Sequence, residues 1–224
     1  MNTIGLIGGM SWESSLAYYR SINEEVSRRF GGLHSAACML YSFDFAHIST
    51  LMHEGEWDAI AALLVHAARA LEKGGAKCLL ICTNTIHILA DRLQAECTVH
   101  LIHIADVTGA QIVADGRKTV GLLGTRLTME GAFYRQRQEE EFGIEVIVPG
   151  DCDREFVDRI IFDEICRELF DVSSRAAMAA IIDRLGQQGA EAVVLGCTEI
   201  PLLIRPDARK GFRLRMALFR AEFG

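Results

Sequence analysis

The feature that most constrains this chain is a repeat that relates its two halves. The segment TIGLIG at 3–8 returns as TVGLLG at 119–124, an offset of 116 residues. The segment GAKCLLICTNT at 75–85 aligns with GAEAVVLGCTE at 189–199, an offset of 114 residues. A single short match could be chance similarity between apolar strands, but two matches in the same order favour duplication. We therefore predict that the chain folds into two similar halves.

The repeated segments have the character of buried strands. Each is a short apolar run that ends at glycine or polar residues, and the stretches between them have helical spacing. Strands that alternate with helices indicate parallel sheets built from βαβ units. The predicted strands are 3–8, 37–43, 77–82, 99–104, 119–124, 145–148 and 192–195. The predicted helices are one that begins near Ser11 or Ser14 and those at 57–73, 86–93, 129–142, 153–170 and 173–187.

The fold class that we predict is α/β, with two similar domains that are each a short parallel sheet flanked by helices. A pseudo-twofold axis is expected to relate the two domains. Because the pattern restarts near 104–109, the first domain is predicted at 1–105 and the second at 106–205. The segment 206–224 then follows as a separate tail.

Composition narrows the classes of function. The net charge is −7 and no basic block lies before residue 205, so nucleic acid and anionic membranes are not expected partners. No apolar run approaches the roughly 18 residues that span a bilayer, and no signal peptide is expected at the start. The seven cysteines are an odd number without CxxC spacing. We therefore expect reduced thiols in a cytoplasmic protein and no metal site.

The repeat also suggests a chemical centre. It aligns Thr83 with Cys197, and each lies at the carboxyl end of a predicted strand, where ligands of parallel α/β sheets collect. Two groups on opposite sides of one carbon can remove a proton from one face and return one to the other, which is racemisation or epimerisation. A thiol suits the base role, because its pKa is about 8.5 and the start of a helix can lower it. The alternative is that Cys197 is a buried structural cysteine. Strand alternation is expected to turn the neighbouring Cys82 toward the core.

No cofactor is expected. None of the four lysines lies at a strand end with a phosphate-binding glycine loop, so pyridoxal phosphate has no support. The glycine pair Gly8-Gly9 lacks the spacing of a dinucleotide fingerprint. A small molecule is therefore the partner that we predict.

Four motifs resemble the aspartate/glutamate racemase family of cofactor-independent amino-acid racemases, and most of all its branch that prefers the L enantiomers. They span about nine-tenths of the chain: GGMSWES at 8–14, CTNTIH at 82–87, LLGTRLTM at 122–129 and GCTEIPLL at 196–203. Family members usually carry Cys-Asn-Thr in the first half and Gly-Cys-Thr in the second, with both cysteines as catalytic bases. Here the second motif is intact, whereas threonine stands at the first position, as it does in the L-preferring branch.

The resemblance implies that Cys197 and Thr83 exchange the α-proton of aspartate or glutamate in a cleft between the two domains. The hydroxyl of Thr83 is a far weaker acid than a thiol, so we expect it to relay its proton slowly. The rates of turnover of the two enantiomers should then differ, although the equilibrium between them is unaffected by the enzyme.

A binding shell is also implied by the resemblance. The residues expected to hold the α-carboxylate and the amine are Met10, Ser11, Asn84, Thr85, Thr125 and Thr198. Candidates for pairing with the side-chain carboxylate are Arg126, Arg154 and Arg159. Each of these could instead be an ordinary turn, cap or surface residue. His87 is more simply interpreted as a polar residue on a helix flank, and His47 could lie over the site.

The tail departs from the family pattern. Relatives usually end with Asp-Thr, a histidine and an amphipathic helix that packs on the first domain. The segment 206–224 is abruptly basic and lacks Asp-Thr-His, although Leu214, Ala217 and Leu218 have the spacing of a short helix. We expect the segment to pack on the first domain, and the resemblance further implies a homodimer.

Two alternatives to an acidic amino-acid racemase remain. One is the chemistry of the related hydantoin racemases or arylmalonate decarboxylases in the same fold. The other is a carboxylate-binding protein with weak or no turnover, which Thr83 and the altered tail favour.

Overall fold

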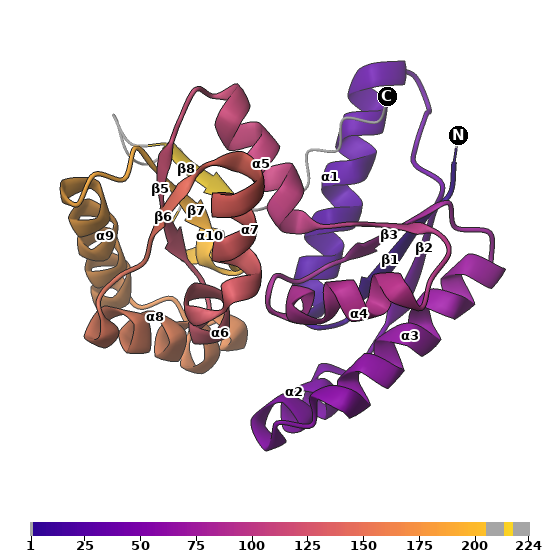
Figure 1. Cartoon of the computed structure of the whole chain (residues 1–224), viewed down its shortest axis with the longest axis horizontal. Coiled ribbons are helices and arrows are strands. Elements are labelled where there is room, and N and C mark those ends of the chain that lie inside the picture. Colours follow the sequence, from indigo (N-terminus) through magenta and orange to yellow (C-terminus); the bar gives the residue numbers. More distant parts are fainter. Residues whose placement is uncertain (1, 205–212, 217–224) are drawn as a thin grey trace. The chain divides into compact units, whose positions relative to one another are not determined.

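The computed structural model describes residues 2–204 and 213–216. The chain forms two compact units, the first ending at Val107 and the second beginning at Thr108 (Figure 1). Each unit is built on a four-stranded parallel sheet flanked by helices. The predicted α/β class with two similar halves is therefore confirmed.

The first unit has four strands that are parallel to one another and lie in the order β2-β1-β3-β4. Its central strands, β1 and β3, are neighbours, so the loops that follow them leave the same edge of the sheet. The elements in chain order are β1 (Ile4–Gly8), α1 (Trp12–Phe30), β2 (Cys38–Ser42), α2 (Phe45–Glu54), α3 (Trp57–Lys73), β3 (Cys78–Ile81), the 3-10 turn η1 (Thr85–Leu89), α4 (Ala90–Ala95), β4 (His100–Ile102) and α5 (Ile104–Ala114), which contains the boundary between the units.

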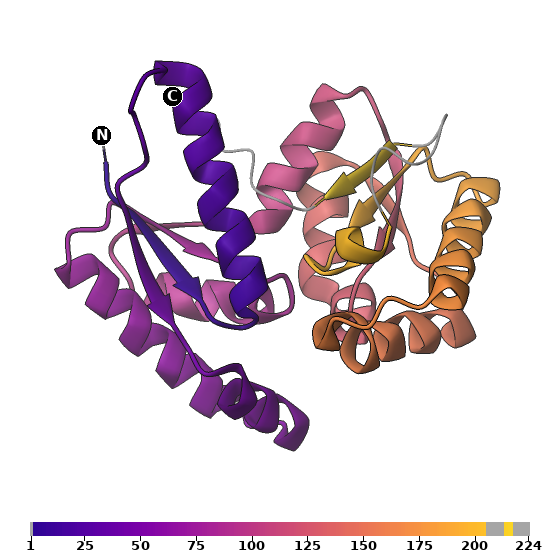
Figure 2. The same cartoon turned by 180° about the vertical axis from the view of Figure 1, so that it is seen from behind.

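Helices cover both faces of the first sheet. Figures 1 and 2 view the chain from opposite sides; α3 and α4 lie in front of this sheet in the first view and α1 lies in front of it in the second. The buried side chains of Ile7, Leu79 and Ile81 pack in one cluster with Leu64 and Leu71 of α3. Because strand side chains alternate between faces, the intervening residues of these strands face α1. This two-sided burial is the reason the strands have nearly continuous apolar sequences.

The second unit repeats this arrangement with strands in the order β6-β5-β7-β8, again all parallel. Its elements in chain order are β5 (Thr119–Leu123), α6 (Arg126–Glu130), α7 (Ala132–Phe142), β6 (Glu145–Ile147), α8 (Asp151–Asp163), the 3-10 turn η2 (Ile165–Arg167), α9 (Val172–Gln187), β7 (Ala192–Leu195), α10 (Ile200–Leu203) and β8 (Arg213–Met216).

The sequence repeat extends to the register of the central strands. In the first sheet Ile4 pairs with Cys78. In the second sheet Val120 and Ala192, the residues that the two offsets align with them, pair with each other. Equivalent segments of the two halves thus occupy equivalent places, and the strand ends before Thr83 and Cys197 correspond.

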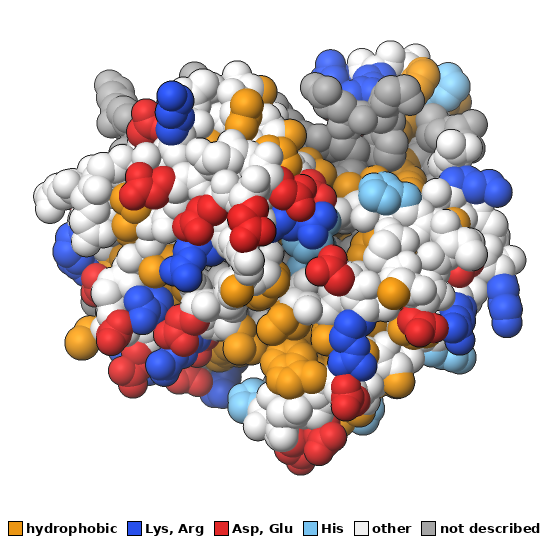
Figure 3. Space-filling model, viewed as in Figure 1, with side chains coloured by type: hydrophobic (Ala, Val, Ile, Leu, Met, Phe, Trp, Pro, Cys, Tyr) orange, Lys and Arg blue, Asp and Glu red, His pale blue; other side chains and the backbone are white. Residues whose placement is uncertain are grey.

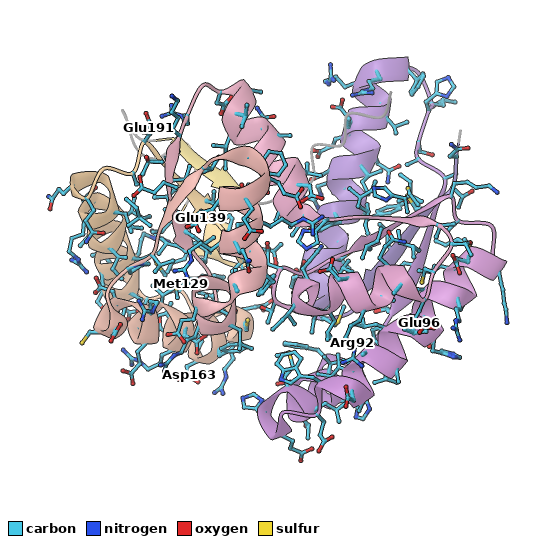
Figure 4. The ribbon with its side chains drawn as sticks, in the orientation of Figure 1. Arg92, Glu96, Met129, Glu139, Asp163 and Glu191 are labelled. Atoms are coloured by element: carbon cyan, nitrogen blue, oxygen red, sulfur yellow. The ribbon has the colours of Figure 1, made fainter. Side chains whose placement is uncertain are left out.

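The core of the second unit lies between its sheet and helices α8 and α9. Strand residues Leu123, Val193 and Leu195 pack in one buried cluster with side chains of both helices, and Cys197 belongs to the same cluster. Met129 of α6, labelled in Figure 4, is fully buried there as well. The alternation that buries Val193 and Leu195 therefore continues to Cys197.

Several segments differ from the sequence-based prediction. The stretch after β2 forms α2, which was not predicted. The boundary between the units does fall within the expected 104–109, at a point inside helix α5. The helix predicted at 86–93 is the turn η1 followed by the short α4.

The tail differs as well. Leu214, expected in a helix, lies in strand β8, which pairs with β7 in the second sheet. The four residues of β8 are thus part of the second unit, whereas 206–224 was predicted to pack on the first. The remaining tail residues, among them Ala217 and Leu218, lie outside the described residues. Among the helices of the described chain, none has both the length and the apolar character that crossing a membrane requires.

Candidate active site

The first group of predicted residues lies at the carboxyl edge of the first sheet. Because β1 and β3 are parallel neighbours, the loops after them begin side by side. These two loops supply five of the predicted residues: Met10, Ser11, Thr83, Asn84 and Thr85.

The loop after β1 is a tight turn that requires glycine. Gly9 has a φ of +82°, and a Cβ at this position would lie 2.2 Å from the carbonyl oxygen of Phe43. The Gly9 N–H donates to Ser15 Oγ at 2.8 Å, which fixes the turn on the first turn of α1. Ser11 caps this helix, because its hydroxyl accepts from the Ser14 N–H at 3.3 Å. The predicted binding residue Ser11 thus also has a structural role.

The loop after β3 is anchored through one of its backbone carbonyl groups. The hydroxyl of Ser14 donates to the carbonyl of Cys82, which joins this loop to α1. Cys82 itself is fully buried, as predicted, and burial followed by the nearby Cys38 raises the pKa of its thiol. Thr83 is half-buried. Met10, from the neighbouring loop, is buried in the core cluster under α3.

His87 connects Thr83 to the start of α5. Its Nε2 accepts from the Ile104 N–H at 3.3 Å, so the ring proton is on Nδ1, which donates to the Thr83 carbonyl at 2.7 Å. The ring of His103 packs edge-on against it, with 4.7 Å between centroids. His87 is therefore a buried group that positions the Thr83 backbone, rather than a polar residue on a helix flank. His47 lies exposed on α2.

Asn84 gives the clearest sign of a ligand site. The residue is 3% exposed, and neither its amide oxygen nor its amide nitrogen has a hydrogen-bond partner within the described chain. A buried amide without partners costs about 1–3 kcal/mol per group, so it requires an explanation. The neighbouring Thr85 is also buried.

The second group of predicted residues surrounds Cys197, which is 7% exposed. Its thiol donates to Oε2 of Glu199 at 3.0 Å, and the hydroxyl of Thr198 donates to the same oxygen at 2.8 Å. Burial, followed by the negative charge of Glu199, raises the pKa of the Cys197 thiol well above its ordinary value. The expectation that a helix start lowers this pKa is wrong for the net effect: the Glu199 N–H does lower the pKa, but burial and the Glu199 carboxylate raise it more.

Thr125 follows β5, the strand beside β7, and therefore lies at the same edge as Cys197. Its hydroxyl caps α6 by accepting from the Thr128 N–H at 3.3 Å. The two loops approach closely, since a Cβ on Gly124 would lie 3.0 Å from the Gly196 carbonyl oxygen. Glycine at both positions thus lets the Thr125 and Cys197 loops meet.

The three candidate arginines have other interactions on the surface of the second unit. Arg126, whose side chain is 60% exposed, pairs with Glu130 at 2.9 Å. Arg154 pairs with the same Glu130 at 3.1 Å, and Arg159 lies over the ring of Phe156. On the side of the second unit that Figure 3 shows, acidic and basic side chains are interspersed, and no patch carries charge of a single sign. The structure therefore does not single out an arginine for the substrate side chain.

One residue of the second group was missed by the sequence analysis. Glu199 is buried, with 8% exposed, and both Cys197 and Thr198 donate to it. A carboxylate two positions after the thiol, in the GCTE motif, was the available signal. The sequence did not reveal that the two side chains turn toward each other.

The fold and these sites define a class of protein. Each half is a parallel α/β unit with polar groups at the carboxyl edge of its sheet. In the first unit these are the Thr83 hydroxyl and the Asn84 amide, which has no partner among the described residues; in the second they are the Cys197 thiol and the Glu199 carboxylate. Small-molecule ligands of α/β enzymes bind at this edge of the sheet. Within this class, the chain belongs to the Asp/Glu/Hydantoin racemase family, whose model matches residues 7–216.

Solved structures support the same grouping. The crystal structure of a "putative Asp/Glu Racemase" from Yersinia pestis is 47% identical with a TM-score of 0.90, and the match covers 97% of this chain and 94% of that one. An aspartate racemase homologue from Pyrococcus horikoshii OT3 is 32% identical with a TM-score of 0.82, at the same coverage. The broad-specificity amino-acid racemase RacX of Bacillus subtilis is 24% identical over 136 residues, which span 59% of each chain.

Proposed function

We propose that this protein is a cofactor-independent racemase of aspartate or glutamate, in which Cys197 and Thr83 exchange protons on opposite faces of the α-carbon. The observation that carries the proposal is the buried, unpaired amide of Asn84, next to Thr83. An amide offers one acceptor and two donors, so it can accept from the substrate ammonium group and donate to the α-carboxylate. Membership of a racemase family then makes an amino acid the natural ligand.

The proposed proton exchange follows from the two side chains. In one direction the deprotonated sulfur of Cys197 takes the α-proton, the electron pair stays on the α-carbon beside the carboxylate, and the Thr83 hydroxyl gives a proton to the other face. In the reverse direction Thr83 must act as the base, for which a hydroxyl is poorly suited at neutral pH. The two enantiomers should therefore be turned over at different rates.

Exchange of the α-proton tests this proposal. The purified chain is incubated in deuterated water with L- or D-aspartate or with L- or D-glutamate, and loss of the α-proton signal is followed by NMR. We expect exchange with at least one of the acids, and a loss of about 100-fold or more in Cys197→Ser, since a positioned acid–base group contributes about 10²–10⁴. Cys152→Ser, which changes an exposed thiol on α8, should leave the rate unchanged.

A second candidate is a carboxylate-binding protein without turnover, which the hydroxyl at Thr83 favours. Calorimetry with the same four ligands separates the two functions. Binding without exchange would support the second candidate. Exchange with a 5-substituted hydantoin in place of either amino acid would instead indicate the related hydantoin chemistry.

A further inference from the structure

The carboxylate of Glu199 lies directly beside the Cys197 thiol and accepts two hydrogen bonds there. A single oxygen, Oε2, accepts from Cys197 Sγ at 3.0 Å and from Thr198 Oγ1 at 2.8 Å. The residue is 8% exposed, so these hydrogen bonds form largely out of contact with water. A carboxylate that accepts two hydrogen bonds in such a place is held in one orientation, with one oxygen directed at the sulfur.

The surroundings of the sulfur explain why such a carboxylate matters. Burial and then the charge of Glu199 raise the pKa of the Cys197 thiol, so the thiol is protonated at neutral pH. Cys166 of η2 is a second titratable group that acts on this sulfur, and the pKa of its own thiol is raised as well. Both thiols are therefore neutral, which leaves Glu199 as the base that adjoins Cys197.

We propose that Glu199 is the positioning residue and proton acceptor of Cys197, a role that rests on the proposed racemase function. The S–H bond of Cys197 breaks and an O–H bond forms at Glu199 Oε2. The thiolate then takes the α-proton, so that a C–H bond breaks, a new S–H bond forms and the electron pair remains on the α-carbon. When the sulfur gives up that proton in the reverse reaction, Glu199 returns its own. After the forward reaction Glu199 holds one proton more and Thr83 one fewer. Exchange with water restores both groups, so protons and electrons balance over the cycle.

The first experiment measures the effect of the Glu199 charge on the Cys197 thiol without relying on turnover. Alkylation of Cys197 by iodoacetamide is followed against pH by peptide mass spectrometry in the parent chain, in Glu199→Gln and in Glu155→Gln, which neutralises an exposed carboxylate on α8. Removal of the neighbouring charge should shift the alkylation profile of Glu199→Gln to lower pH, so that labelling at pH 8 is at least as fast as in the parent. Glu155→Gln should match the parent. Identical profiles in all three proteins would overturn the proposal, even if the parent racemises nothing.

The second experiment measures α-proton exchange in the same proteins. We expect Glu199→Gln to lose about 100-fold in exchange rate with an unchanged KM, while Glu199→Asp retains part of the rate. A purely structural role predicts that alkylation and exchange fall together, and a parent-like exchange rate in Glu199→Gln would contradict the proposal directly. If the parent itself shows no exchange, the racemase function fails, while the alkylation profiles still decide whether the Glu199 carboxylate acts on the Cys197 thiol.

Discussion

At the scale of single residues, the two halves carry different chemistry at equivalent places. The thiol of Cys197 is buried and donates to a carboxylate, whereas Thr83 is half-buried and has its carbonyl held by His87. The two positions align in the repeat, so equivalent strand ends carry different side chains in different surroundings. This asymmetry leads to a prediction about the direction of turnover.

Replacing Thr83 with cysteine should restore a second thiol. Because a thiol is a far better base than a hydroxyl, we expect exchange of the slower enantiomer to rise by about tenfold or more. Deuterium exchange into D- and L-aspartate measures the change. Thr83→Ser, which keeps the hydroxyl, should remain at the parent rate, and a cysteine variant no faster than the serine variant would refute the pairing of Thr83 with Cys197.

At the scale of elements, the glycine turn after β1 fixes the loop that carries Met10 and Ser11. Gly9 combines a positive φ with a backbone contact that excludes any Cβ. The sequence pattern Gly8-Gly9 predicts a tight turn, but only the fold places the Phe43 carbonyl against it.

The Gly9→Ala substitution should therefore destabilise the folded protein strongly. We expect a loss of about 4 kcal/mol in the free energy of unfolding, from backbone strain together with the clash against Phe43. Gly55→Ala is the matched control, since Gly55 has a φ of +75° but open space where a Cβ would be, and it should cost about 1 kcal/mol. Urea denaturation monitored by circular dichroism compares the two. Equal losses would show that strain alone, without the clash, decides the effect.

Some elements could be predicted from the sequence and others could not. The helix at Trp57–Lys73 was predicted with its observed bounds, because one apolar face and a closing glycine pair are local signals. Helix α2 was missed although Phe45, Ile48 and Met52 have helical spacing and pack on the core; the helix has only ten residues, and Ile48 is the one that it buries fully. Strand β8 was predicted as part of a helix because its pairing with β7 depends on a distant segment.

At the scale of the whole molecule, each sheet is fastened at its amino-terminal edge by a carboxylate. In the first unit, Glu72 accepts from the N–H groups of Thr98 and Val99, at 2.6 and 2.8 Å. In the second unit, Glu191, labelled in Figure 4, accepts from the N–H groups of Lys118 and Thr119 at 2.7 and 3.1 Å. The Val99 N–H holds the pKa of Glu72 below its ordinary value of 4.5, and the Lys118 N–H does the same for Glu191.

This arrangement predicts how stability depends on pH. A carboxylate whose pKa is lower in the folded state contributes stability that is fully present above its unfolded pKa and is lost as pH falls through its folded pKa. The Tm of the parent should therefore fall below about pH 5, and the double variant Glu72→Gln/Glu191→Gln should fall less steeply. Calorimetry from pH 3 to 7 measures both. Glu54→Gln, on the exposed end of α2, should keep the parent slope, and a double variant with that same slope would contradict the prediction.

The sequence by itself determined the α/β class, the duplication and the placement of Thr83 and Cys197 at equivalent strand ends. Strand length, apolar continuity and the position of glycines are local properties of the sequence. The repeat allowed the strand ends found in one half to be aligned with those of the other. The tertiary structure alone decided that the Cys197 thiol is buried against Glu199, that the amide of Asn84 has no partner among the described residues and that Arg126 and Arg154 pair with Glu130. These properties depend on which side chains the fold brings within a few ångströms and how much water it leaves there, and neither is written in the order of the residues.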